Sequence, residues 1–366
     1  MRRLAVLVLA SVLIAADEKP KPPLDLAPPP EPSSKWHDND LTKADAEDLR
    51  MEARHLAYEE ELPEEAAQLQ HWAVKADPTR GHYNLACFYS MAGKLDAAFY
   101  WLQYCGMDGE GMDPDWVQED SDLENARKDE RWKGVHAYIA ACSEWWETNG
   151  EPRTVLTLPQ GYQMGTEIAA LVGLHGLGSV PDDFSGGPAF QRLADRLGAA
   201  LIGVSGTRRG GQRTFAWSEE IDRDMARVKA ALEEVKDRVT IRAGHVVVIG
   251  FSQGAQLAVE LPARDPETFA GGIALCPGGR KNCQLGSIAK PSELLAGRTF
   301  LLIHGELEQE GNLALGEADE KWLSARGALV QRHVYPGMAH SFPPDELNNF
   351  EIWTRFILST RERAGK

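Results

Sequence analysis

Ser252 stands between two glycines in "GFSQG", residues 250–254, where a strand-like run gives way to a helix-like run. The preceding residues 245–249 are mostly apolar and β-branched, as in a buried parallel strand, and residues 255–261 have the composition of a helix. A G-x-S-x-G segment at such a junction lifts the serine Oγ above the sheet, because the two glycines leave room for a sharp turn. Ser252 is therefore the candidate nucleophile, and the alternative is a tight turn that contains an incidental serine.

A serine nucleophile needs a base, an acid that orients the base, and donors for the oxyanion. His340, in "VYPGMAHSF", follows the last predicted strand on a loop from which an imidazole could reach the serine. Five of the ten histidines precede residue 150, and His333 lies inside a predicted strand. His340 is therefore the candidate base.

The acid is expected after the penultimate predicted strand, since the triad of α/β-hydrolases runs serine, acid, histidine along the chain. The segment "TFLLIHGELEQEGN" ends such a strand in three carboxylates. Glu308 is the first candidate for the acid, and Glu306 and Glu310 remain open.

The oxyanion donors in this arrangement are backbone N–H groups. One comes from the residue after the nucleophile, Gln253, and the other from the loop after an early strand. The loop "GLHGLGS" contains two glycines that let the backbone turn inward, so Leu177 is the second candidate donor. His175 in the same loop is expected to brace it.

Four segments, "LHGLGS", "GFSQGA", "HGELE" and "YPGMAHS", are similar in order and spacing to the motifs of the phospholipase/carboxylesterase family, which includes acyl-protein thioesterases. The resemblance covers residues 153–361. It implies an α/β-hydrolase that cleaves esters or thioesters without a metal or other cofactor. It also implies that Ser252 is the nucleophile, His340 the base and Glu308 the acid.

Two departures from the family pattern stand out. The family's acid is ordinarily an aspartate followed by Val-Pro, whereas Glu308 is followed by "QEGN". In "SGTRRGGQRTFAWSEE", Trp217 resembles the family's loop tryptophan, but the nearby arginines are unusual. Trp217 and Arg209 are the candidate substrate contacts, the arginine for an anionic group; the alternative is that the arginines are merely solvated.

The chain that must position these residues changes character near residue 150. From residue 150 to 366, short apolar runs alternate with helical stretches, which predicts a doubly wound, mostly parallel sheet. Residues 41–145 have helical periodicity, and "NLACFYSMAGKLDAAFYWLQYC" fits the small and large positions of a tetratricopeptide (TPR) repeat. We therefore predict an all-α TPR-like domain before the α/β-hydrolase domain, either as a docking surface for a protein or peptide partner or as a spacer.

The N-terminus has the order of a secretory signal peptide. Residues 1–16, "MRRLAVLVLASVLIAA", join two arginines to an apolar run that is too short for a comfortable membrane span. A secreted or periplasmic location is expected, and an uncleaved anchor is the alternative. Residues 17–40 are so rich in proline and charge that they predict a disordered, extended tether.

The net charge and the cysteine content exclude several classes of partner and of structure. A net charge of −16 argues against nucleic acid or an anionic membrane surface, because both require positive charge. Five cysteines are too few for a disulfide scaffold, although Cys276 could bridge to Cys283, and Cys87 to Cys105; buried free thiols are the alternative. No Cys/His cluster has zinc spacing.

The sequence thus predicts an exported serine hydrolase whose substrate is a small-molecule or lipid ester, or a thioester. Two other functions remain open. One is a serine exopeptidase or a dienelactone-hydrolase-like enzyme of the same fold. The other is a degenerate hydrolase that acts as a binding protein through its helical domain.

Export gives the first testable prediction. The mature chain isolated from its native host should begin near Asp17, because the apolar run ends there and a signal peptidase would remove it. N-terminal sequencing measures this directly. An intact Met1 in soluble cytoplasmic material would contradict the prediction.

Overall fold

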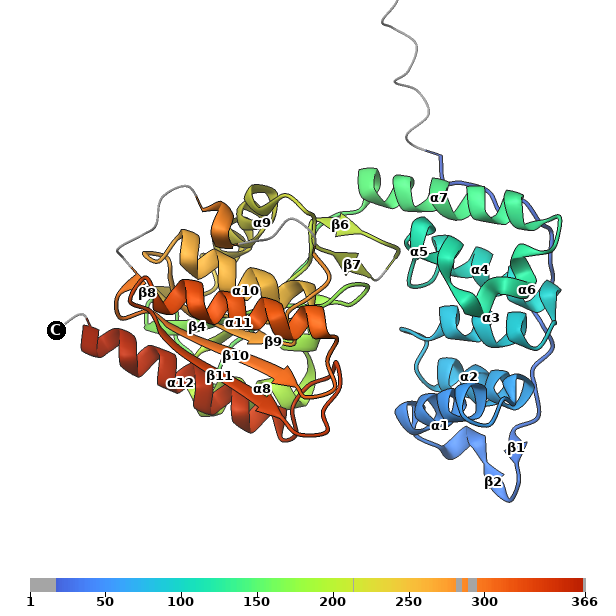
Figure 1. Ribbon diagram of the computed structural model, residues 1–366, viewed down its shortest axis with the longest axis horizontal. Coiled ribbons are helices and arrows are strands. Elements are labelled where there is room, and N and C mark those ends of the chain that lie inside the picture. Colours follow the sequence, from blue (N-terminus) through green and yellow to red (C-terminus); the bar gives the residue numbers. More distant parts are fainter. Residues whose placement is uncertain (1–17, 213, 281–284, 289–294, 365–366) are drawn as a thin grey trace, which may run out of the picture. The chain divides into compact units, whose positions relative to one another are not determined.

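The computed structural model describes residues 18–212, 214–280, 285–288 and 295–364 (Figure 1). The chain divides into two compact units. The helical unit comprises residues 1–151 together with 209–214, and the sheet unit comprises residues 152–208 together with 215–366. The predicted signal peptide, residues 1–16, lies outside the described residues.

The helical unit is built from helix pairs joined by short turns. Helix α1 packs on α2, and α3 packs on α4. Asp45 caps the first helix, since its carboxylate accepts the N–H groups of Glu47 and Asp48. The helices are α1 (Ala46–Tyr58), α2 (Pro63–Ala76), α3 (His82–Met91), α4 (Leu95–Met107), α5 (Pro114–Glu119), α6 (Glu124–Arg127) and α7 (Trp132–Asn149), with 3-10 turns η1 (Leu41–Lys43) and η2 (Ser121–Leu123). The helices agree with the predicted helical periodicity of residues 41–145, and the assignment to the TPR class stays a prediction.

The proline-rich segment before these helices is not the free tether that the sequence predicts. Its last residues form strand β1 (Lys35–Trp36), which pairs with β2 (Asn39–Asp40). Leu24 and Leu26 pack against the apolar core of the helices. The prediction considered only the apolar surface that the segment could bury on itself. The helices supply that surface instead, so residues 18–40 are ordered against them.

The sheet unit contains a seven-stranded sheet of order β11-β10-β9-β8-β4-β5-β3. Neighbouring strands are parallel except β3, which runs antiparallel to β5. The strands are β3 (Thr154–Thr157), β4 (Glu167–Leu174), β5 (Ala200–Val204), β8 (Thr240–Phe251), β9 (Phe269–Leu275), β10 (Thr299–Gly305) and β11 (Leu329–Tyr335). The short strands β6 (Arg208–Arg209) and β7 (Phe215–Ala216) pair with each other.

Helices cover both faces of this sheet (Figure 1). One core cluster joins the strands to Val228 of α9 and Leu257 of α10, and a second joins the opposite face to Leu193 of α8 and Phe350 of α12. The helices are α8 (Gly187–Leu197), α9 (Ile221–Glu234), α10 (Gln253–Arg264), α11 (Glu310–Ser324) and α12 (Glu346–Ala364), with 3-10 turns η3 (Pro181–Phe184) and η4 (Leu285–Ser287). The predicted fold class, a doubly wound, mostly parallel sheet preceded by a helical region, is confirmed.

The structure also bears on the predicted absence of a membrane span and on the state of the cysteines. Within the described residues, no helix is both long and apolar enough to span a bilayer. Cys87, Cys105, Cys142 and Cys276 are buried free thiols, so the bridge between Cys87 and Cys105 does not form. Cys283 lies outside the described residues.

A buried ion pair fixes the loop after β9 to helix α9. Arg280 and Asp224 meet at 2.8 Å with both side chains fully buried. The same carboxylate accepts the N–H and the hydroxyl of Ser218, the residue after Trp217. The pair therefore ties three segments of the sheet unit together.

Removing one partner of this pair should destabilise the fold. We expect Asp224→Ala to lower the free energy of unfolding by about 3–5 kcal/mol, because Arg280 would be left charged and buried without its partner. Urea unfolding measures the difference. Asp222→Ala is the matched control, since Asp222 is exposed on the same helix; equal losses in the two variants would contradict the prediction.

Candidate active site

Ser252 occupies a strained turn between β8 and α10. Its φ of 55° and ψ of −116° lie outside the regions that residues with a side chain ordinarily adopt. A Cβ on Gly250 would lie 2.1 Å from the carbonyl oxygen of Gly254, and one on Gly254 would lie 2.1 Å from that of Leu174. The two glycines of the motif are therefore required for the close backbone packing at this turn.

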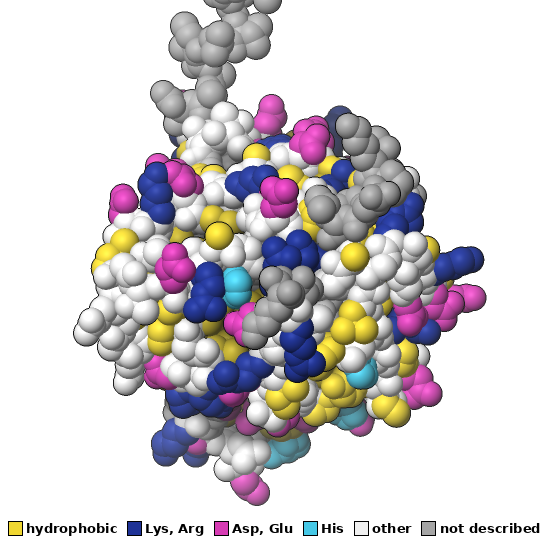
Figure 2. All heavy atoms as spheres, turned by 90° about the vertical axis from the view of Figure 1, so that its left-hand side faces the viewer, with side chains coloured by type: hydrophobic (Ala, Val, Ile, Leu, Met, Phe, Trp, Pro, Cys, Tyr) yellow, Lys and Arg dark blue, Asp and Glu magenta, His cyan; other side chains and the backbone are white. Residues whose placement is uncertain are grey.

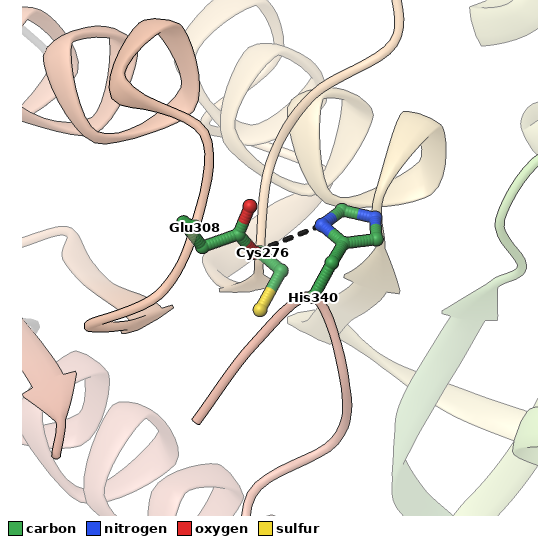
Figure 3. Close-up of side chains that lie close together, drawn as sticks. All are labelled: Cys276, Glu308 and His340. Carbon is green, nitrogen blue, oxygen red and sulfur yellow. Dashed lines mark hydrogen bonds and ion pairs between the residues drawn. The ribbon is translucent and has the colours of Figure 1, made fainter. Parts of the chain in front are cut away.

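Of the three glutamates considered as the acid, Glu308 is the one that contacts His340. The imidazole Nδ1 and the carboxylate Oε1 are 2.8 Å apart, and Figure 3 shows the two side chains pointing toward each other. Glu308 has a fully buried side chain, whereas that of His340 is 40% exposed. Glu306 accepts the N–H of Gly337 instead, and Glu310 is exposed at the start of α11.

The Glu308 carboxylate is held ionised by its neighbours. Burial alone would raise its pKa, but hydrogen bonds from Asn312, Cys276 and His340 together lower the pKa below its ordinary value. Asn312 Nδ2 donates to the second oxygen, Oε2, at 2.9 Å. The carboxylate can therefore accept the imidazole N–H and stabilise a positive charge on His340.

Sequence reasoning missed both Cys276 and Asn312. Asn312 lies in the first turn of α11, and Glu308 lies two residues before that helix begins, so the turn between them brings the two side chains together. Cys276 follows β9, and only the strand order brings it between Ser252 and Glu308. Burial and the adjacent Glu308 carboxylate raise the pKa of the Cys276 thiol to about 12, so the thiol stays protonated. Its Sγ donates to the carbonyl oxygen of Ser341 at 3.4 Å and lies within 4.8 Å of a Glu308 oxygen.

The base lies beside the nucleophile's strand. The rings of His340 and Phe251 have centroids 4.9 Å apart, and Phe251 immediately precedes Ser252. Among the hydrogen bonds of the described residues, none joins Ser252 Oγ to His340. Such bonds are often long in a ligand-free enzyme and tighten when substrate binds.

The two candidate oxyanion donors lie on elements that the sheet places next to each other. Gln253 is the first residue of α10, where backbone N–H groups have no partner within the helix. Leu177 follows β4, the neighbour of β8, and its side chain is 61% exposed. The side-chain amide of Gln253 is engaged with the N–H of Trp217 and the carbonyl of Gly279.

His175 and Trp217 support the loop that carries Leu177. His175 is buried, and burial lowers its pKa to about 4, so its ring is neutral. Its Nδ1 lies 2.6 Å from the carbonyl oxygen of Gly176, and its Nε2 accepts the N–H of Gly206. Trp217 stacks on His175 and donates its indole N–H to the His175 carbonyl. With 1% of its surface exposed, Trp217 braces the loop, and its predicted substrate contact is not favoured.

Arg209, the other predicted substrate contact, belongs to the helical unit. Its guanidinium lies over the ring of Trp146 at 4.8 Å and donates to the carbonyl oxygens of Glu151 and Gly211. These contacts use guanidinium N–H donors that were expected to bind an anionic group of the substrate. We therefore do not assign Arg209 to the substrate site.

Comparison with known proteins bears on the sheet unit. The family described as Phospholipase/Carboxylesterase matches residues 213–357, which include Ser252, Glu308 and His340. Residues 213–357 of the sheet unit are therefore similar to hydrolases of the phospholipase/carboxylesterase type. The resemblance is thereby confirmed for the three motifs in this range, "GFSQGA", "HGELE" and "YPGMAHS"; the motif "LHGLGS" precedes the matched residues.

A putative esterase named NocK, from Nocardia uniformis subsp. tsuyamanensis, is 30% identical to this chain over 117 residues. The match spans 31% of this chain and 32% of that relative, so it concerns one segment of each protein.

Two solved structures resemble the chain at low sequence identity. A Bacillus cereus carboxylesterase is 18% identical, with 59% of this chain and 99% of that chain covered and a TM-score of 0.44. Arabidopsis thaliana SOBER1 is 22% identical, with 52% of this chain and 99% of that chain covered and a TM-score of 0.40.

The acid of the hydrolase unit gives the next prediction. We expect Glu308→Gln to lower kcat by about 10² to 10⁴, because an amide cannot stabilise the imidazolium as a carboxylate does. The measurement is steady-state hydrolysis of a p-nitrophenyl ester, with circular dichroism to verify folding.

Glu306→Gln and Glu310→Gln are the matched controls for this variant, since neither carboxylate contacts His340. Both should retain near-normal kcat. A collapse of activity in Glu310→Gln alone would mean that the acid is misassigned by two residues.

Proposed function

We propose that the chain is an exported serine hydrolase that cleaves carboxylic esters or thioesters through Ser252, His340 and Glu308. The observation that carries this proposal is the 2.8 Å contact between His340 Nδ1 and Glu308 Oε1 next to a serine held at a strained strand-to-helix turn. The family match supports the hydrolase class, and the residues support the order of events below.

In the first half of the reaction, Ser252 Oγ attacks the carbonyl carbon of the substrate while His340 Nε2 takes the serine proton. Glu308 accepts the Nδ1–H and stabilises the resulting imidazolium. The negative charge on the carbonyl oxygen is received by the backbone N–H groups of Leu177 and Gln253. Collapse of this intermediate breaks the ester bond, and His340 returns the proton to the departing alcohol or thiol.

In the second half, a water molecule attacks the acyl group on Ser252. His340 takes a proton from the water and then returns it to Ser252 Oγ as the acid leaves. Each proton taken from serine or water is thus given to a leaving oxygen or sulfur. Substrate and this water are the only reactants that the balance of the reaction requires.

The carboxyl edge of the sheet favours an apolar acyl group. Leu177 and Leu307, from the loops after β4 and β10, expose 61% and 65% of their surfaces. Sites for small ligands are lined mostly by apolar side chains, and these two residues lie on the loops that carry a candidate oxyanion donor and the acid. We infer an ester or thioester of an apolar acid as the substrate class.

Two parts of the proposal concern the rest of the chain. Export rests on the residue pattern of positions 1–16. The helical unit is proposed as a docking surface for a peptide or protein partner. A binding protein built on a degenerate hydrolase is less favoured, because Ser252, His340 and Glu308 are all present and the last two are in contact.

Catalysis by the triad predicts that Ser252→Ala and His340→Ala each lose about 10⁴-fold or more in kcat, because the members act as a unit. The test uses p-nitrophenyl esters of graded chain length, and a fluorophosphonate probe that should label the wild-type chain but not Ser252→Ala.

Ser324→Ala is the matched control, since Ser324 is exposed at the end of α11. It should keep wild-type kcat and labelling. Full activity in Ser252→Ala would refute the assignment of the nucleophile.

A further inference from the structure

The proline-rich segment is held on the helical unit by side chains that bind its backbone. Leu24 N–H donates to Gln103 Oε1 at 2.9 Å, and Gln103 Nε2 donates to the Leu24 carbonyl oxygen at 3.2 Å. A single amide of α4 thus satisfies both polar groups of one residue of the segment.

A second anchor lies nine residues further along, on α2. Trp72 Nε1 donates to the carbonyl oxygen of Ser33 at 2.9 Å, and Gln68 Nε2 donates to the carbonyl oxygens of Ser33 and Lys35 at 2.8 and 3.0 Å. Glu31 adds an ion pair with Lys75 at 2.5 Å. The segment is therefore bound at both ends of its proline-rich stretch.

The α2, α4 and α7 helices all contribute to this surface, which we call the strap face. Figure 1 shows the segment running in an extended path along the helical unit from α7 to β1. At the α7 end, the Lys19 ammonium lies over the Trp145 ring at 5.5 Å. Each contacted helix therefore holds a different part of the segment.

The segment lies on the surface and is not part of the core. Every residue from 18 to 40 is exposed or half-buried, including Leu24 and Leu26. Recesses of about 570 and 650 Å³ remain beside it, one lined by Glu31, Pro32, Trp72 and Lys75, the other by Leu26 to Pro30 and the turn before α4. The segment therefore lies over the helices as a surface layer and not as an interior one.

We propose that the strap face is a recognition site for an extended, proline-rich peptide, and that residues 24–35 occupy it in cis. The partner it fits carries an apolar residue for the position of Leu24 and a carboxylate for Lys75. Proline favours the extended conformation before binding, so little entropy is lost when such a peptide binds. The proposal deepens the docking role proposed for the helical unit and does not depend on catalysis.

A tethered ligand competes strongly with a free one. A short connection gives the cis segment an effective concentration on the order of millimolar, so a partner reaches the strap face only by displacing residues 24–35. Weakening the segment should therefore open the site. Removing a contact residue of the helices, such as Gln103, should weaken binding of both the cis segment and a free peptide.

The test measures binding of a fluorescent peptide of residues 18–36 by anisotropy. We expect the full-length variant Leu24→Ser/Leu26→Ser to bind this peptide at least about tenfold more tightly than the wild-type chain, because its own segment no longer competes effectively. Adding Gln103→Ala to that variant should weaken binding again. Circular dichroism verifies that each chain is folded, and equal affinities in all three chains would overturn the proposal.

Hydrogen exchange tests the same point with the residues of the segment left unaltered. The Leu24 amide should exchange faster than the amides of α4, through local release of the segment, and Gln103→Ala should accelerate the Leu24 amide alone. If Leu24 exchanges only together with α2 and α4, the segment is a fixed layer of the fold and the proposal is wrong. Sedimentation of a wild-type dimer held by exchanged segments would identify a second copy as the occupant and would overturn the assignment to a separate partner.

Discussion

The close approach of three backbone segments beneath Ser252 is the constraint on which the candidate active site depends. Gly250 ends the run of β8 that pairs with β4 at Leu174, and Gly254 lies against the Leu174 carbonyl from the first turn of α10. A side chain at either glycine would push the helix away from the sheet. The positive φ of Ser252 persists because this packing leaves no other path for the backbone.

The rest of the site is ordered by the succession of strands. Ser252, Cys276, Glu308 and His340 follow β8, β9, β10 and β11, which are neighbours in the sheet as well as in the chain. His340 starts from the edge strand and its ring reaches Phe251, so the loop after β11 carries the base back over two intervening strands. The hydrogen bond from Nδ1 to the Glu308 carboxylate holds the imidazole in that position.

Local patterns predicted the parts of the site that depend on local geometry. The glycines around Ser252 and the alternation of strands and helices are properties of adjacent residues, so the sequence alone predicts them. Cys276 contacts Glu308 only because β9 and β10 are neighbours, and no spacing encodes that. Trp217 and Arg209 were assigned by their chemical type, but their burial and their carbonyl partners depend on the fold. The composition of residues 17–40 predicts disorder because composition describes only the apolar surface that a segment can bury on itself.

The glutamate in place of the family's aspartate is matched by the residues around it. Its side chain is one methylene longer, so its carboxylate reaches a fully buried position where the donors come from three different elements: Asn312 on α11, Cys276 after β9 and His340 after β11. An aspartate at the same backbone position would draw the carboxylate back from these donors while still paying the desolvation cost of a buried charge. The acid and its donors therefore form one arrangement, in which the length of the side chain at position 308 determines whether the charge that supports His340 is stabilised.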